Sequence, residues 1–242
     1  MIRRTGFILI LALLTSALNA QTENRDTVTN AKSRIIINAS GAWSIAMGKY
    51  QTTTTTDEYA GYASDGFIGQ VGINWIGKHE LGLGVTYVFQ HNGFQKKAEN
   101  ICPPGQDYLG SGGWNNHYFL AGPVYIKEFG RISMDISVLG GFVLSTGTIF
   151  SLEVPDTLHP YVSSGTGFGF GFQAKAYAGY RISKKVFITA GISYLGGTPS
   201  RSKSFYTLVQ DPNVGWTYVG SETVIKKKIS TINPGVGVMI KL

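Results

Sequence analysis

Residues 34–48 read RIIINASGAWSIAMG, and this stretch alternates between apolar side chains and small or polar ones. One face of the segment carries Ile35, Ile37, Ala39, Gly41, Trp43, Ile45 and Met47. The other face carries Asn38, Ser40, Ala42, Ser44 and Ala46. Because successive side chains of a strand point to opposite faces of a sheet, this period of two predicts a β-strand that is apolar on one face only.

The same period recurs along the rest of the chain. It is found in residues 66–75, 80–90, 116–127, 131–146, 165–183, 186–194 and 232–242. In the segment 116–127 we assign to the apolar face Tyr118, Leu120, Val124 and Ile126. Together with residues 34–48, these segments predict an all-β chain of eight strands.

The connections between the predicted strands alternate in length. The short ones are residues 76–79, 128–130 and 184–185, and the long ones are residues 48–65, 91–115, 147–164 and 195–230. Short turns at one end and long loops at the other are typical of an antiparallel transmembrane β-barrel with periplasmic turns and extracellular loops. An even number of strands would place both termini on the periplasmic side.

The volume of the side chains predicts which face of each strand points outward. The interior of an eight-stranded barrel is only just wide enough for its own side chains. The apolar face, rich in Leu, Ile, Phe and Trp, would overfill that space, whereas the opposite face of Gly, Ser, Ala, Asn, Thr and Gln would fit. We therefore expect the apolar face to meet lipid, and the last strand to pair with the first so that no edge is left open.

The N-terminus predicts export from the cytoplasm. Arg3 and Arg4 precede an apolar run at residues 7–14, and small or polar residues follow as far as Ala20. This order is that of a signal peptide, and the run is shorter than the roughly 20 residues that a membrane-spanning helix needs. We expect a signal peptide at 1–20, with Ala17 as the other cleavage position, a periplasmic tail at 21–33 and the barrel at 34–242.

The composition fits a membrane protein better than a soluble one. Hydrophobic residues make up 43% of the chain and charged residues 14%, whereas a soluble domain carries about 25% charge. The net charge is +7, but an exported chain without a basic, aromatic-interleaved motif is not expected to bind nucleic acid. Cys102 is the only cysteine, so no internal disulfide can form, and a reactive or intermolecular role for it stays open.

Charged residues on the predicted inward face form a candidate site. They are Asp135, Lys175 and Arg181. Since buried charges are costly unless they are paired, we expect Asp135 to pair with Lys175 or Arg181, as a structural network or as a proton or ion path. The glycines at 165, 167, 169 and 171 do not match a phosphate-binding loop, and no cofactor, metal or catalytic site is expected.

With these strands and its C-terminus GVGVMIKL, residues 235–242, the chain resembles the small OmpA/OmpX-type outer-membrane barrels over residues 34–242. In that family, a glycine five residues before an apolar last residue, with another apolar residue two before it, signals assembly. Gly237, Ile240 and Leu242 match this pattern, whereas Gly235 stands where a polar residue is usual and the last residue is Leu rather than Phe. The resemblance implies the outer membrane as location and the barrel assembly machinery as a partner. The junction Asn19-Ala20-Gln21 is similar to signal peptides of Bacteroidota.

The last long connection predicts a protruding hairpin. Residues 203–210 and 216–228 both have strand character, around the turn Asp211-Pro212-Asn213. Near the base of this hairpin stand Arg201, Lys203, Lys226, Lys227 and Lys228. We expect these cations to contact phosphates of outer-membrane lipids, including lipopolysaccharide, or to be simply solvated.

Three functions are compatible with the sequence. The preferred one is a monomeric, non-enzymatic barrel with a structural, adhesive or surface-binding role in its long loops, whose ligand the sequence does not identify. The second is a small channel, against which the narrow interior and its charges argue. The third is an enzyme that modifies lipid A, for which His117 is the only plausible base, with no serine or acid clearly placed beside it.

Overall fold

The structure of the chain is a computed structural model, which describes residues 33–51, 63–77, 79–94, 108–111, 113–147, 149–152, 161–164, 166–211 and 215–242. The predicted signal peptide, residues 21–32 of the predicted tail, and Cys102 lie outside these residues. No helix within the described ranges is long and apolar enough to cross a membrane.

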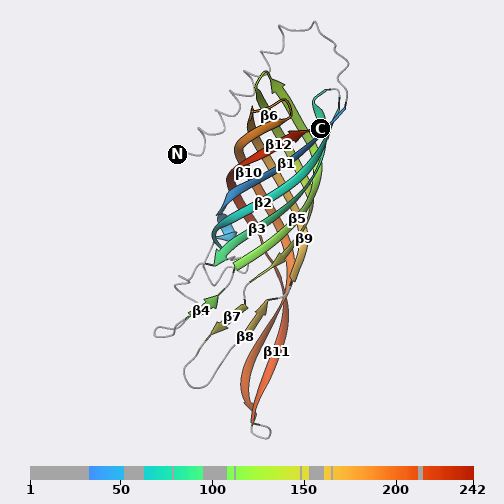
Figure 1. Cartoon of the computed structure of the whole chain (residues 1–242). Coiled ribbons are helices and arrows are strands. Elements are labelled where there is room, and N and C mark those ends of the chain that lie inside the picture. The colour runs from blue at the N-terminus through green and yellow to red at the C-terminus, as the bar shows by residue number, and fades with distance from the viewer. Residues whose placement is uncertain are drawn as a thin grey trace, which may run out of the picture. The chain divides into compact units, whose positions relative to one another are not determined.

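Eight long strands close into one antiparallel barrel within the described residues (Figure 1). They are β1 (Arg34–Ala46), β2 (Ala63–Ile76), β3 (Leu81–Phe94), β5 (Gly113–Phe129), β6 (Ile132–Thr146), β9 (Thr166–Arg181), β10 (Val186–Asp211) and β12 (Ile229–Lys241). Each strand pairs with the next in this order, and β12 pairs with both β10 and β1. The predicted eight-stranded closed barrel is therefore confirmed, including the pairing of the last strand with the first.

Short turns join the strands at one end of the barrel, which we call the short-turn end. Between β5 and β6, Gly130 has a φ of 61°, a left-handed conformation that glycine adopts without steric cost. Between β2 and β3, Glu80 has a φ of 64°, and its carbonyl oxygen accepts a 2.9 Å hydrogen bond from the Ile126 N–H. This left-handed turn explains why β3 begins at Leu81, one residue later than the sequence predicts.

The outer surface of the barrel is apolar, as the alternation predicts. Large apolar side chains exposed on it include Ile35, Trp43, Phe67, Val71, Ile73, Trp75, Leu83, Val85, Val138, Phe142, Phe168, Phe170, Ile188, Ile192, Val236 and Val238. A soluble protein rarely exposes so large a continuous apolar surface. A belt of this kind is what a membrane-spanning barrel presents to lipid.

The predicted orientation is wrong for one strand, β5. Tyr118, Leu120, Val124 and Ile126 are at most 1% exposed and point into the barrel rather than outward. Both faces of β5 are rich in apolar and aromatic residues, so its alternation did not distinguish them. Neighbouring glycines provide the space inside, because a Cβ atom at Gly171 would lie 2.7 Å from Cδ1 of Tyr118.

The sheet continues past the barrel at the opposite end, which we call the long-loop end (Figure 1). β10 runs on past the barrel and pairs from Ser200 to Asp211 with β11 (Gly215–Lys226). On its other edge β10 pairs with β8 (Tyr161–Ser164), followed by β7 (Ile149–Leu152) and β4 (Tyr108–Ser111). The predicted hairpin is therefore present, as the pair β10–β11.

Candidate functional site

A cluster of charges occupies the barrel interior at the short-turn end. The carboxylate of Glu128 accepts hydrogen bonds from Arg34 Nη1 at 2.8 Å, Arg181 Nη2 at 2.8 Å and Lys241 Nζ at 3.1 Å. These three cations come from β1, β9 and β12, so one acid on β5 connects four strands. Charge-assisted hydrogen bonds of this kind are stronger than neutral ones.

A second ion pair lies deeper in the barrel. Lys175 Nζ is 3.0 Å from Asp135 Oδ2, and both residues are only 6% exposed. Next to them, Gln173 donates to Gln70 at 2.8 Å, and Gln70 donates to Ser40 at 2.6 Å. The ion pair borders an internal cavity of about 10 Å³, which is about the space of one water molecule.

A neutral hydrogen-bond network crosses the barrel toward its long-loop end. At its centre, Gln90 donates to Ser44 at 2.9 Å and to Thr231 at 3.1 Å, while its own oxygen accepts from Tyr118 and Asn116, both at 3.2 Å. The network continues from Asn116 to Ser145 and to the hydroxyl of Tyr50, at 2.6 and 3.1 Å. These bonds join β1, β3, β5, β6 and β12 across the lumen.

The short 3-10 helix η1 (Gly48–Tyr50) closes this part of the barrel. Tyr50 is fully buried, and the Lys227 ammonium lies 5.2 Å from the centre of its ring and also over the ring of Trp114. Burial raises the pKa of the Tyr50 phenol well above its ordinary value, although the hydrogen bond with Asn116 acts against this. Burial therefore keeps the hydroxyl protonated over a wider pH range than usual, as a neutral member of the network.

The predicted interior charges fall into two separate sites. The structure brings Asp135 and Lys175 together. Arg181 does not join them, because its guanidinium reaches Glu128 near the short turns, and its side chain is 34% exposed. The three residues therefore do not form one group. Asp135 and Lys175 form an ion pair, and Arg181 belongs to the separate cluster around Glu128.

The cations predicted to contact lipid phosphates are also divided. Lys227 is 6% exposed and points to the rings of Tyr50 and Trp114, so its expected contact with lipid is wrong. Burial of its long apolar stem beside two aromatic rings explains this position. Lys228 is exposed. The β10–β11 ribbon carries Arg201, Lys203 and Lys226, whose backbone the structure describes but whose side chains it does not.

Two residues of the predicted assembly signal lie on opposite faces of β12, and the third, Leu242, follows its last residue. Gly237 points inward, where a Cβ atom would collide with Ser40, and Ile240 and Leu242 are exposed on the outer surface. A role in assembly stays a prediction from the sequence.

The histidine considered as a base, His117, lies on the outer face of β5. Its Nδ1 atom is 2.8 Å from the hydroxyl oxygen of Tyr87. Among the described residues, no group of three or more His, Cys, Asp or Glu side chains is placed to hold a metal ion.

The sequence reasoning missed most of the Glu128 cluster. Strict alternation already places Arg34 and Lys241 on the inward faces of their strands, which was a usable signal. Glu128 was assigned to a turn, although it stands near the end of β5 and shares the inward face of Tyr118. The wrong orientation of β5 therefore hid the acid that holds the cluster together.

Comparison with known proteins gives structural matches only. No family model matches the chain, and no curated protein matches its sequence. A major outer membrane protein from Thermus thermophilus matches with 8% identity and a TM-score of 0.48, over 88% of this chain and 100% of the other. Ail, the attachment invasion locus protein of Yersinia pestis, matches with 16% identity and a TM-score of 0.40, over 88% and 100%. The outer membrane protease OmpT from Escherichia coli matches with 10% identity and a TM-score of 0.43, over 90% and 100%. At these identities an activity does not carry over from any of the three.

Proposed function

We propose that this chain is an integral outer-membrane barrel that acts without catalysis, by binding partners at the cell surface through the sheet beyond its long-loop end. The partner chemistry that fits this sheet is an extended peptide segment, which adds to it as a further strand. The observation that carries the proposal is the open edge of β11.

Within the described residues, β11 pairs with β10 only, from Gly215 to Lys226. In an antiparallel ladder, every second residue directs its N–H and C=O groups away from the paired neighbour. The outer edge of β11 therefore offers a row of main-chain donors and acceptors. Such an edge is a template for strand addition, in which main-chain hydrogen bonds supply the affinity.

The filled interior favours surface binding over conduction. Tyr118, Leu120, Leu139 and Leu195 are at most 1% exposed inside the barrel. The Gln90 network connects β3 to β1 and β12 across the lumen, and the Asp135–Lys175 pair between neighbouring strands occupies the interior as well. An open channel would require these connected side chains to separate.

The same proposal sets the orientation and the assembly of the chain. The short-turn end and both termini face the periplasm after removal of residues 1–20, and residues 21–33 form a periplasmic tail. Gly237, Ile240 and Leu242 are read by the barrel assembly machinery, and the mature barrel is a monomer. Arg201, Lys203, Lys226 and Lys228 stand where the ribbon leaves the barrel, and they contact phosphates of outer-membrane lipids such as lipopolysaccharide.

A peptide copy of β10 tests the strand addition. The fluorescent peptide SRSKSFYTLVQD, residues 200–211, pairs with β11 in the native ribbon. We expect it to bind the full chain in lipid nanodiscs and a scrambled peptide to bind far less, as measured by fluorescence anisotropy. Equal binding of the two peptides contradicts the proposal, as do sustained open events of the full chain in planar bilayers.

Proline variants at adjacent positions of β11 supply a matched control. One of the residues Tyr218 and Val219 directs its N–H toward β10, and the other directs it to the open edge. Proline at the open-edge position blocks an added strand without removing a native hydrogen bond, whereas proline at the other position breaks the ribbon. We expect the proline variant at the open-edge position to lose peptide binding, while its ribbon stays as resistant to protease as that of the parent chain.

A further inference from the structure

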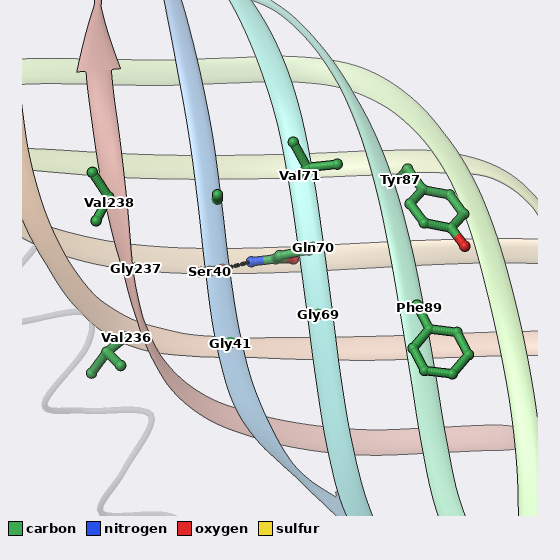
Figure 2. A pocket seen from close by; sticks show the side chains of 11 residues that line it. Ser40, Gly41, Gly69, Gln70, Val71, Tyr87, Phe89, Val236, Gly237 and Val238 are labelled. Atoms are coloured by element: carbon green, nitrogen blue, oxygen red, sulfur yellow. Dashed lines mark hydrogen bonds between the residues drawn. The ribbon is translucent and has the colours of Figure 1, made fainter.

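A shallow groove of about 530 Å³ lies on the outer, apolar surface of the barrel (Figure 2). Its floor is formed by β1 and β2, at Gly41 and Gly69, which are paired directly across the two strands. Val236 and Val238 of β12 stand along one side of the floor, and Tyr87 and Phe89 of β3 stand along the other. In Figure 2 the two aromatic rings lean away from the floor, which leaves the two glycines uncovered.

The strand register also bounds the groove along the strands. Toward the long-loop end, Trp43 pairs with Phe67, and these side chains are 59% and 51% exposed. Toward the short-turn end, Ala39 and Val71 form the next outward pair and also line the groove, and Ile37 pairs with Ile73 beyond them. Large side chains therefore surround the floor on all its sides, and the hollow is a bounded site rather than a stripe of small residues.

The fold does not require a glycine at either floor position. Neither Gly41 nor Gly69 has a positive φ. A Cβ atom at Gly69 would meet no heavy atom within 4 Å, and one at Gly41 would come no nearer than 3.9 Å to the Ile68 carbonyl oxygen. By contrast, a Cβ atom at the inward-facing Gly237 would collide with Ser40. Because glycine weakens a strand interior, two facing glycines without a packing reason suggest that the hollow itself has a use.

A polar pair stands at the rim of the groove on the β3 side. Tyr87 lines the groove, and its hydroxyl oxygen lies 2.8 Å from Nδ1 of His117 on β5. His117 is opposite Phe89 in the register, and their ring centres are 5.2 Å apart. Polar and ionisable groups on a lipid-facing surface are costly, and they commonly mark functional positions.

We propose that the groove binds one acyl chain of a membrane lipid, and that the polar group of the same lipid hydrogen-bonds to Nε2 of His117. This inference rests on the membrane placement in the proposed function. The apolar belt continues on every side of the groove, so the acyl chains that cover the belt also reach the floor. A hollow lined by valine and aromatic side chains takes a flexible hydrocarbon chain, and the Tyr87–His117 pair gives that chain a polar anchor. A second copy of the barrel fits less well, because a symmetric dimer requires a self-complementary surface.

Photolabelling of the full chain in nanodiscs tests this site. The probe is phosphatidylcholine with a diazirine at the end of one acyl chain, and the adducts are mapped by mass spectrometry of peptides. We expect adducts to concentrate on the groove residues of β1, β2, β3 and β12 above the level on β6 and β9. In Gly41→Leu/Gly69→Leu, whose Cβ atoms meet no close neighbour and whose side chains occupy the hollow, the groove signal falls to the level of the remaining belt.

A control variant places the same pair of leucine side chains elsewhere on the belt. Ala178 and Ala190 are exposed on the outer surface and are paired across β9 and β10. Ala178→Leu/Ala190→Leu is expected to leave the groove adducts unchanged. His117→Phe keeps an aromatic ring and is expected to reduce these adducts, because the lipid loses its polar anchor. Native mobility on a gel without heating shows that each variant has folded.

The outcomes separate the site from the proposed function. Uniform labelling of the belt, or equal labelling of the filled-groove variant and the parent chain, overturns the site and leaves the membrane placement intact. Crosslinks between two chains at the groove overturn it in favour of a dimer. An unlabelled belt overturns the site together with the membrane placement. Adducts that do not change in His117→Phe overturn the polar anchor.

Discussion

Inside the barrel, Lys175 Nζ lies 3.0 Å from Asp135 Oδ2, and the two residues are equally buried. They stand on neighbouring strands, β9 and β6, and each points away from the lipid-facing surface. Removing a charge from water is costly, and in a buried pair the attraction between the two charges offsets this cost. If one partner is lost, the other remains buried without compensation. The ion pair therefore makes the packing of the interior depend on two particular side chains.

Removing one member of this pair is expected to destabilise the barrel strongly. Asp135→Asn leaves a buried lysine without its counter-charge, which costs about 3–5 kcal/mol. Asp135→Asn/Lys175→Met removes both charges and should recover most of this loss. Urea unfolding in phospholipid vesicles, followed by tryptophan fluorescence, measures the three free energies, with Ser133→Ala as a control for a buried polar change. A double variant as unstable as the single one contradicts this account.

Glu128 is expected to matter more than any one of its partners. Glu128→Gln leaves Arg34, Arg181 and Lys241 close together without the acid that binds them, whereas Lys241→Gln removes one of three contacts. We expect Glu128→Gln to cost about 1–3 kcal/mol, with a smaller loss at high salt, which screens the remaining repulsion. The same vesicle unfolding assay, at low and high salt, checks this. Equal losses in the two variants would show that the cluster does not act as a unit.

Gly171 and Gly69 are expected to respond in opposite ways to alanine. A Cβ atom at Gly171 would lie 2.7 Å from Cδ1 of Tyr118, whereas one at Gly69 meets nothing within 4 Å. Gly171→Ala should therefore overpack the interior and cost about 1–3 kcal/mol, and Gly69→Ala should cost nothing or stabilise the strand. Tyr118→Leu removes the contact, so it should abolish the effect of Gly171→Ala in the double variant. Unfolding free energies of the parent chain and these four variants decide the matter.

The fold could be predicted from the sequence because a membrane barrel repeats one simple pattern. In β1, β2 and β9, side chains of opposite character alternate, and in each case the predicted outward face is the exposed one. In β5, aromatic and apolar residues stand on both faces, since Tyr118 points inward and Phe119 outward. Alternation carries no information where both faces are apolar, and the inward position of Tyr118 fits the space that glycines such as Gly171 leave inside the barrel.

The interior site was predicted in part, for a related reason. Alternation placed Asp135 and Lys175 on inward faces, but it does not give the distance between residues on different strands. Arg181 is inward as well, yet the register takes it to Glu128. The expected contact of Lys227 with lipid phosphates rests on its position near the base of the hairpin. The direction of its side chain depends instead on the rings of Tyr50 and Trp114, which are distant in sequence.

The central claim is that the apolar face of every barrel strand meets hydrocarbon. Spin labels at positions 187 to 190, 192 and 193 of β10 test it most directly in the full chain with Cys102→Ser, reconstituted in phospholipid bilayers. We predict high collision rates with oxygen, which concentrates in hydrocarbon, at 188, 190 and 192, and low rates at 187, 189 and 193, a period of two. Oxygen collision rates that peak at 187, 189 and 193, or outward positions reached by a water-soluble relaxation agent, would contradict it.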